Sequence, residues 1–337
     1  MRILGIETSC DDTAAAVVED GCRILSNVVS SQERLHERFG GIVPEVACRA
    51  HIESLLPVVD QALLDAGIGM RAIDALAVTT TPGLIGALLI GLTSAKAASW
   101  ALDLPLVAVN HLEAHIYGAW LSGTEVALPA VSLVVSGGHT SLYLTEGPVT
   151  HRLLGATADD AAGEAFDKVA NILKLGFPGG PAIERTARQG NPGAFDLPRA
   201  WLAPEGLDFS FSGLKTAVLY HCLGQNASKS DIERAAYDPG FVADMAASFQ
   251  EAVVDVLVHK ACMAAERVGA AGVILGGGVG ANTLLRQRLA EAVLSMGLKA
   301  VLTPPELCRD NAAMVAGLAY HLHAAGRTVP LSVEAVP

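Results

Sequence analysis

RILGIETSCDDTAAAVVEDGCRILSNVVS, residues 2–30, opens the chain with three apolar runs that are separated by short segments rich in Ser, Asp and Gly. Apolar, β-branched runs are typical of strands, and the residues between them are typical of turns. We therefore expect strands at 2–7, 13–19 and 23–30. The following residues predict a helix at 44–66, a strand at 73–79, a helix at 83–101, a strand at 106–109 and a short helix from His111 to His115. The predicted order is βββαβαβα.

The same order begins again at Ala130. Its predicted strands are 131–136, 140–145 and 149–154, and its first helix is 159–173. After an insert at about 176–240 come a helix at 241–268, a strand at 272–275, a helix at 282–296, a strand at 299–303 and a helix at 311–325. Two copies of one pattern predict two α/β lobes with a central cleft, where ligands usually bind. We expect lobe one at 1–128 and lobe two at 129–310, with the C-terminal helical segment 311–337 packed back on lobe one.

The composition indicates a well-packed globular protein. Of the 337 residues, 51% are hydrophobic and 17% are charged, a balance that excludes disorder. The net charge of −12 is unusual for a protein that binds nucleic acid alone, because Lys and Arg make most phosphate contacts. Only 168–234 is basic, with eight basic and six acidic residues, whereas 1–128 has seven basic and fifteen acidic residues.

The cysteines and the apolar segments favour a cytoplasmic protein. Six cysteines form no CxxC pair and no regular framework, so we predict neither a zinc ribbon nor a disulfide scaffold. The N-terminus lacks the long apolar core of a signal peptide. The most apolar segment, 83–102, is interrupted by Thr93, Ser94, Lys96 and Ser99, and we interpret it as a buried helix without a role in a membrane.

The pentapeptide HLEAH, residues 111–115, is a candidate metal chelate. His111 and His115 are spaced i, i+4 and share one face of a helix. In the zinc-protease signature HExxH the Glu follows the first His directly, but here Glu113 lies about 200° around the helix from His111. A pair of ordinary core histidines is the favoured interpretation of such a motif in isolation, and a metalloprotease stays an alternative.

Three loops combine glycine or hydroxyl residues with the start of a strand or helix. Residues 5–13 and 135–140 join the first two strands of each predicted lobe, and Gly137-Gly138 suits a tight primed hairpin turn whose amides can approach an anion. Residues 273–282 lead from a strand through a glycine loop into a helix, which is typical of nucleotide sites. A dinucleotide site is the weaker interpretation, because the next strand ends without an acid.

Eight motifs in this order resemble the bacterial TsaD family of tRNA N6-adenosine threonylcarbamoyltransferases, formerly described as O-sialoglycoprotein endopeptidases (Gcp). They are GIETSCDDT (5–13), HLEAH (111–115), VSGGHT (135–140), DDAAGEAFDK (159–168), PGGP (178–181), DFSFSGLKT (208–216), GGGVGAN (276–282) and RDNAAM (309–314). The resemblance implies a duplicated actin-like ATPase fold of the ASKHA, RNase H-like type. It also implies transfer of a threonylcarbamoyl group from threonylcarbamoyl-adenylate to the N6 amine of adenosine 37, beside the anticodon, in tRNAs that read codons beginning with A.

The resemblance also implies site residues. The metal, most often Fe2+ with Zn2+ as the alternative, would have His111, His115 and Asp310 as ligands. The substrate contacts would be Val134, Val135, Ser136, Gly137, Gly138, Asp167, Gly180, Glu184 and Asn282. The chain departs from the family pattern at Glu184, which is Asp in some members, and at Asp12, where Glu is common.

The mechanism and the partners follow from the same resemblance. We hypothesise that Asp11 or His139 takes the proton of the attacking amine. The expected partners are tRNA, the catalytically inactive paralogue TsaB and the P-loop ATPase TsaE. We predict that basic residues of the insert region contribute to the RNA surface, namely Lys174, Arg185, Arg188 and Lys215. A small-molecule kinase or carbamoyltransferase of the same fold and a non-enzymatic paralogue are further alternatives.

Overall fold

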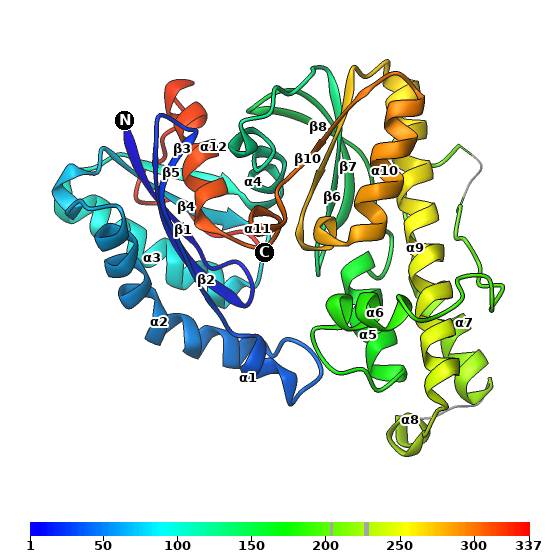
Figure 1. Cartoon of the computed structure of the whole chain (residues 1–337). Coiled ribbons are helices and arrows are strands. Elements are labelled where there is room, and N and C mark those ends of the chain that lie inside the picture. The colour runs from blue at the N-terminus through cyan, green and yellow to red at the C-terminus, as the bar shows by residue number, and fades with distance from the viewer. Residues whose placement is uncertain (203–204, 226–228) are drawn as a thin grey trace. The chain divides into compact units, whose positions relative to one another are not determined.

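The structure is a computed structural model that describes residues 1–202, 205–225 and 229–337 (Figure 1). The chain forms two compact units. Unit 1 comprises Met1–Val126, Gly147–His151 and Thr303–Pro337, and unit 2 comprises Ala127–Glu146 and Arg152–Leu302. Two segments thus lie outside the lobe in which we expected them. Residues 147–151 belong to unit 1 because Val149 packs on its core, and 303–310 belong there because Asp310 contacts His115.

Unit 1 contains a five-stranded sheet in the order β3-β2-β1-β4-β5. Its strands are β1 (Arg2–Glu7), β2 (Asp12–Glu19), β3 (Arg23–Ser31), β4 (Ala75–Thr81) and β5 (Leu106–Asn110). The pairs β1–β2 and β2–β3 are antiparallel, whereas β1–β4 and β4–β5 are parallel. Side chains alternate between the two faces of a strand, and both faces of this sheet are buried.

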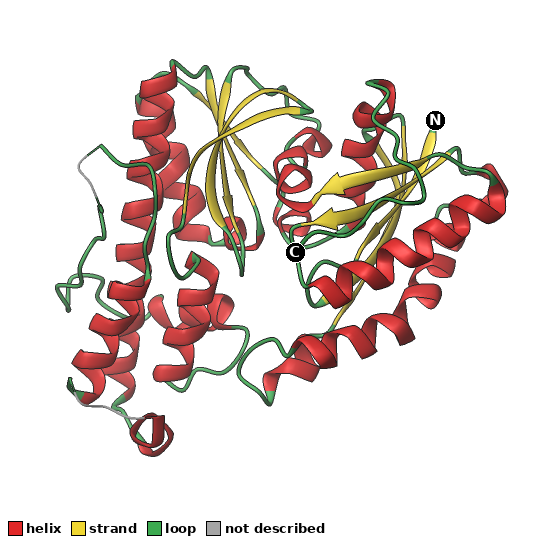
Figure 2. Ribbon diagram, turned by 180° about the vertical axis from the view of Figure 1, so that it is seen from behind, coloured by secondary structure: helices red, strands yellow, loops and turns green. Residues whose placement is uncertain are grey.

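Helices cover both faces of the unit 1 sheet. On one face, α2 (Pro44–Asp65) and α3 (Ile85–Leu102) run side by side, as Figure 2 shows, and pack against residues such as Leu4 and Ile6. On the other face, α12 (Ala312–Ala324) and α4 (His111–Tyr117) pack against the alternate strand residues, such as Ile3. A side chain at Gly5 would place its Cβ 2.5 Å from the carbonyl oxygen of Ala312, so glycine allows α12 to approach β1. The remaining short elements of unit 1 are α1 (Glu33–Glu37), η1 (Met70–Ala72), η2 (Trp120–Ser122) and α11 (Pro305–Cys308).

Unit 2 repeats the sheet order of unit 1. Its order is β10-β9-β6-β7-β8, which reads from the other edge as 8-7-6-9-10 and corresponds strand by strand to 3-2-1-4-5. The strands are β6 (Ala130–Val135), β7 (Thr140–Gly147), β8 (Thr150–Ala156), β9 (Gly272–Gly276) and β10 (Lys299–Leu302). The helices are α5 (Ala162–Ile172), α6 (Gly179–Ala187), α7 (Ser212–Leu223), α8 (Lys229–Arg234), α9 (Pro239–Val268), η3 (Gly278–Ala281) and α10 (Thr283–Ser295). The predicted duplication of βββαβαβα is confirmed.

Helix α3 differs from the prediction of a buried helix. In the described part of the chain it alone is long and apolar enough to cross a membrane by length and composition, with 33% of its residues buried. Its buried residues include Leu92 and Ala95, which belong to the core cluster on the sheet. Leu89 and Trp100 are 47% and 78% exposed. The prediction is therefore right for one face only, because the apolar run continues around the helix and the sheet covers one side.

Candidate metal centre and glycine loops

Helix α4 begins at His111 because Asn110 caps it. The Oδ1 atom of Asn110 accepts hydrogen bonds from the backbone N–H groups of Leu112 and Glu113, at 2.9 and 3.1 Å. Such a cap satisfies amides that have no partner within the helix. The cap fixes the helix directly after β5, so that His111 and His115 occupy successive turns of one face.

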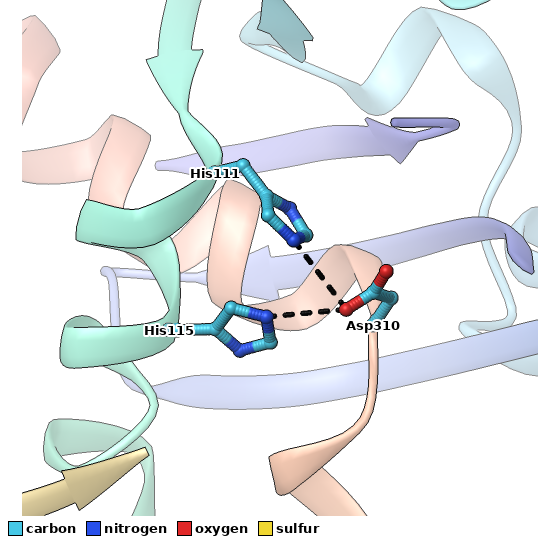
Figure 3. Close-up of side chains that lie close together, drawn as sticks. All are labelled: His111, His115 and Asp310. Carbon is cyan, nitrogen blue, oxygen red and sulfur yellow. Dashed lines mark hydrogen bonds and ion pairs between the residues drawn. The ribbon is translucent and has the colours of Figure 1, made fainter. Parts of the chain in front are cut away.

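Both imidazoles point at the same carboxylate oxygen. His115 Nε2 lies 3.1 Å from Asp310 Oδ1, and His111 Nε2 lies 3.5 Å from that oxygen (Figure 3). One ligand atom from each of the three residues lies within 4.8 Å of the other two. Asp310 is held by the start of α12, where Asn311 accepts from Met314 N–H and donates to the Leu307 and Arg309 carbonyls. Residues some two hundred positions apart in sequence therefore meet within unit 1.

A second layer of hydrogen bonds orients His111. Its Nδ1 lies 3.0 Å from Glu7 Oε2 and 3.2 Å from Ser9 Oγ. Glu7 is fully buried at the end of β1 and also accepts from Ser9 N–H and from the Thr79 hydroxyl, both at 2.6 Å. A carboxylate at Nδ1 holds a proton on that nitrogen, so Nε2, which faces Asp310, is the atom that gives up its proton when a metal binds.

The donor set fits a divalent transition metal. Two imidazoles and one carboxylate form the facial arrangement that such metals accept, with other positions open. In the second layer, a carboxylate holds the far nitrogen of His111, as is usual for a metal-bound histidine. Sequence reasoning missed Glu7, although an acid at the end of an apolar strand was a usable signal.

The ionisable groups of this cluster perturb one another strongly. Burial opposes the charged form of His111, but Asp310 and Glu7 outweigh it and raise the pKa of His111 well above its usual value. The pKa of Asp310 is held well below its usual value by His111 and His115 in spite of burial. Burial lowers the pKa of His115. In the metal-free protein the cluster is therefore an imidazolium, a neutral imidazole and carboxylates.

Glu113 lies outside the metal cluster. Its side chain lines a separate cavity with Arg327, and burial raises its pKa. It is not among the three described residues whose ligand atoms converge. A metalloprotease needs an acid within reach of metal-bound water, so the placement of Glu113 agrees with the sequence argument against that alternative.

The segment that joins β1 to β2 carries two acids near the same cluster, the partly buried Asp11 and the buried Asp12. Burial and the Asp310 charge raise the pKa of Asp11, and they raise the pKa of Asp12 to about 7. Asp12 Oδ1 is buried without a hydrogen-bond partner, and Asp12 Oδ2 lies 3.7 Å from Arg309. His51, which sequence reasoning also missed, holds the loop through the Cys10 carbonyl at 2.9 Å and the Thr13 hydroxyl at 2.8 Å.

The loop between β6 and β7 is a tight turn in unit 2. Ser136 N–H donates to the His139 carbonyl at 2.8 Å, and His139 N–H donates to Ser136 Oγ at 3.2 Å. The prediction of a primed turn is wrong, because neither Gly137 nor Gly138 has a positive φ. A Cβ on either glycine would meet no atom within 4 Å, so both glycines leave open space above their backbone. Val134 and Val135 are fully buried, backbone included.

Three predicted substrate residues in unit 2 have structural partners. Asp167 accepts from Gly179 N–H at 2.7 Å and so positions the start of α6, next to Gly180. Asn282 caps α10 through Leu285 N–H and donates to Gln250 Oε1 at 2.9 Å. Glu184 accepts from Thr283 N–H at 3.4 Å. The structure thus brings Glu184 beside the 276–282 loop.

The glycine loop at 276–282 packs on the end of β6. Gly277 has a φ of +87°, and a Cβ there would lie 2.4 Å from the Val135 carbonyl oxygen. Only glycine tolerates both conditions. The 276–282 loop is thereby joined to the strand that leads into the Ser136–His139 turn.

Comparison with known proteins decides the family. The family model described as "TsaD: tRNA N6-adenosine threonylcarbamoyltransferase" matches residues 23–317. The chain belongs to the TsaD family. Among its TsaD relatives, tRNA N6-adenosine threonylcarbamoyltransferase of Moorella thermoacetica is 50% identical, over 100% of this chain and 96% of the relative. The protein of that name from Thermomicrobium roseum is 53% identical, over 99% of this chain and 95% of the relative.

Solved structures support the actin-like fold of this TsaD chain. The HypF protein of T. kodakarensis has a TM-score of 0.59 at 16% identity, over 97% of this chain and 48% of that protein. Component A of the Acidaminococcus fermentans (R)-2-hydroxyglutaryl-CoA dehydratase has a TM-score of 0.53 at 17% identity, over 96% of this chain and 99% of that protein. These neighbours and the two matching sheets agree with the duplicated ASKHA fold that the motifs implied.

Proposed function

We propose that this protein transfers a threonylcarbamoyl group from threonylcarbamoyl-adenylate to the N6 amine of adenosine 37 in tRNA. The observation that carries the proposal is the match to TsaD proteins along the whole chain, at about half identity. The geometry adds to it, because the chain keeps a buried two-histidine, one-carboxylate set together with the glycine loops. A purely structural paralogue would have no use for that set.

His111, His115 and Asp310 would hold the metal, for which we favour Fe2+ over Zn2+. When bound, the metal would supply a Lewis acid that polarises substrate oxygens. Glu7 and Ser9 would orient His111 toward that metal.

Asp11 or His139 would accept the proton that the N6 amine loses as it attacks the carbamoyl carbon. Asp11 has a raised pKa, which brings a carboxylate closer to the basicity that a general base needs near neutral pH. The anhydride of the adenylate is already activated, so alignment of amine and carbamoyl carbon is the main task left to the protein. Loss of the correct base should slow transfer by about 10² to 10⁴-fold.

The substrate would be held by backbone and polar groups of unit 2. Ser136, Gly137 and Gly138 offer a turn with open space above it for the adenylate. Asp167, Gly180, Glu184 and Asn282 would complete the site. Because Asp167 and Asn282 also position helices α6 and α10, their replacement should disturb the loops as well as ligand contacts.

We infer further that the protein works in the cytoplasm with TsaB and TsaE, and that basic residues of unit 2 help to hold the tRNA. Lys174 and Arg185 are exposed. Arg188 is paired with Glu184 at 3.3 Å and Lys215 with Asp160 at 3.0 Å, so these two would contribute less charge to an RNA surface.

The proposal is tested by incorporation of labelled threonine into unmodified tRNA. The reaction contains the synthase that makes the adenylate from threonine, bicarbonate and ATP, the partner proteins, and either this protein or buffer. We expect label in tRNA only when this protein is present. Label that appears equally without it would contradict the proposal.

A further inference from the structure

A second cavity of unit 1 lies next to α4 and is not part of the metal cluster. It has a volume of about 310 Å³ and is lined by residues of β4, β5, α4 and the segment after α12. The polar residues that line it are Thr80, Thr81, Asn110, Glu113, Arg327 and Thr328. A cavity of this size is at the lower end of the range that holds small molecules.

Two opposite charges face this cavity from different elements. Glu113 comes from α4 and Arg327 from the segment that follows α12. The structure gives the Glu113 carboxylate no hydrogen bond and no ion pair among the described residues, although the side chain is half-buried. Among the described residues, the Arg327 guanidinium donates one long hydrogen bond, from Nη1 to the Val149 carbonyl at 3.4 Å. Both charges therefore keep donor or acceptor capacity for a ligand.

The rest of the lining is suited to a small organic molecule. In the described structure, the hydroxyl groups of Thr80, Thr81 and Thr328 line the cavity without a recorded side-chain hydrogen bond. Apolar surface comes from Ala108 and Val329, which are partly exposed. A ligand with a cationic end, an anionic end and a small apolar part would match all three kinds of group. Half-buried ionic contacts of this kind are stronger than neutral hydrogen bonds.

We propose that this cavity binds a free α-amino acid with a small branched side chain. The ammonium group would lie at Glu113, the carboxylate at Arg327, and the side chain against Ala108 and Val329. Hydroxyl groups of the threonines would complete the hydrogen bonds of the zwitterion. The proposal goes beyond the transferase activity and does not depend on it, because no residue of the metal cluster or of the glycine loops lines the cavity.

The test is a ligand-observed NMR titration of the full-length protein with L-valine as the probe. Two matched analogues dissect the recognition: isovalerate lacks the ammonium group, and isobutylamine lacks the carboxylate. We expect saturable L-valine binding with a dissociation constant of about 1 mM or tighter. Each analogue should bind at least about tenfold more weakly, because it loses one of the two charge-assisted contacts of the zwitterion.

Variants locate the binding. Glu113→Gln and Arg327→Gln keep the side-chain size, and each should weaken L-valine binding at least about tenfold. Glu53→Gln and Arg23→Gln change exposed residues elsewhere in unit 1 and serve as controls that should bind as the wild type does. Thermal melting curves verify that all four variants fold. Absence of saturable binding, equal binding of isovalerate and L-valine, or binding that survives both cavity variants would each overturn the proposal.

Discussion

Replacement of Glu7 by Gln is the most informative perturbation of the metal centre. The two oxygens of Glu7 accept from three donors: Oε1 from Ser9 N–H, and Oε2 from the Thr79 hydroxyl and His111 Nδ1. The substituted glutamine has the same shape but only one oxygen. If that oxygen keeps the hydrogen bond from Ser9 N–H, the amide NH2 group faces His111 Nδ1. The Nδ1 atom must then be the unprotonated nitrogen that accepts a hydrogen bond from the amide. His111 then carries its proton on Nε2, the atom directed at Asp310.

The alternative orientation of the substituted amide is also unfavourable. It places the NH2 group against Ser9 N–H and leaves a buried backbone donor without an acceptor, which costs about 1–3 kcal/mol. Either way the protein binds metal more weakly, because the first orientation places a proton on Nε2 and the second replaces the carboxylate behind His111 by a neutral amide oxygen. Loss of a partner behind a histidine ligand typically lowers metal affinity by about 10 to 100-fold, which corresponds to about 1.4–2.7 kcal/mol.

The assay is a competition titration with Co2+, followed by the visible absorption of the bound ion, for wild type, Glu7→Gln and Glu53→Gln. Glu53 is exposed on α2, so its variant should bind Co2+ as the wild type does. Equilibrium unfolding of the metal-free proteins separates loss of affinity from loss of fold. A Glu7→Gln protein that folds and binds Co2+ within about twofold of wild type would refute the orienting role of Glu7.

Three further predictions concern other parts of the molecule. Burial raises the pKa of Asp12 to about 7, so the native state holds this proton more tightly than the unfolded state does. The stabilisation from this proton is complete below pH 4 and is lost as the pH rises through 7. In urea unfolding of the metal-free proteins, the free energy of unfolding of Asp12→Asn should therefore rise relative to wild type by up to about 4 kcal/mol between pH 4 and pH 8. Lys260 is 1% exposed and donates hydrogen bonds to the carbonyls of Trp201, Gly206 and Asp208. Lys260→Met should therefore lower the free energy of unfolding by about 3–5 kcal/mol, and a loss below about 1 kcal/mol would show that the three carbonyls find other donors. Arg185→Glu should weaken tRNA binding and flatten its dependence on salt, and an unchanged slope would place the RNA surface elsewhere.

Local patterns in the sequence were sufficient for the strands, for the main helices of both units and for the duplication, but not for helices α6, α7 and α8 of the insert, where no helix was predicted. Strands with alternating or continuous apolar residues and helices with caps such as Asn110 depend on neighbouring residues, and these elements are where the sequence predicts them. The direction of Glu113 also followed from helix geometry alone. By contrast, nothing in the spacing of residues links His111 to Asp310, and only the resemblance to a family joined them. Their contact depends on α12 packing against the same sheet face as α4.

Features that depend on tertiary packing were missed or mistaken. Glu7 and His51 are buried polar residues, and their importance appears only when the residues that they hold are close in space. The turn at Gly137-Gly138 lacks the positive φ that the pair of glycines suggested. A Cβ at Gly163 of α5 would lie 2.5 Å from the Ser136 carbonyl oxygen, so helix α5 packs directly against this turn. The sequence of the turn itself gives no sign of that contact.

The central claim is most directly tested by the chemical identity of the nucleoside that the protein makes. Unmodified tRNA is incubated with threonylcarbamoyl-adenylate, the partner proteins and either wild-type protein or the Asp310→Ala variant, and is then digested and analysed by mass spectrometry. The account predicts N6-threonylcarbamoyladenosine from position 37 with the wild type and its loss with the variant. Unmodified adenosine after incubation with metal-loaded wild type, or the same product without this protein, would contradict the account.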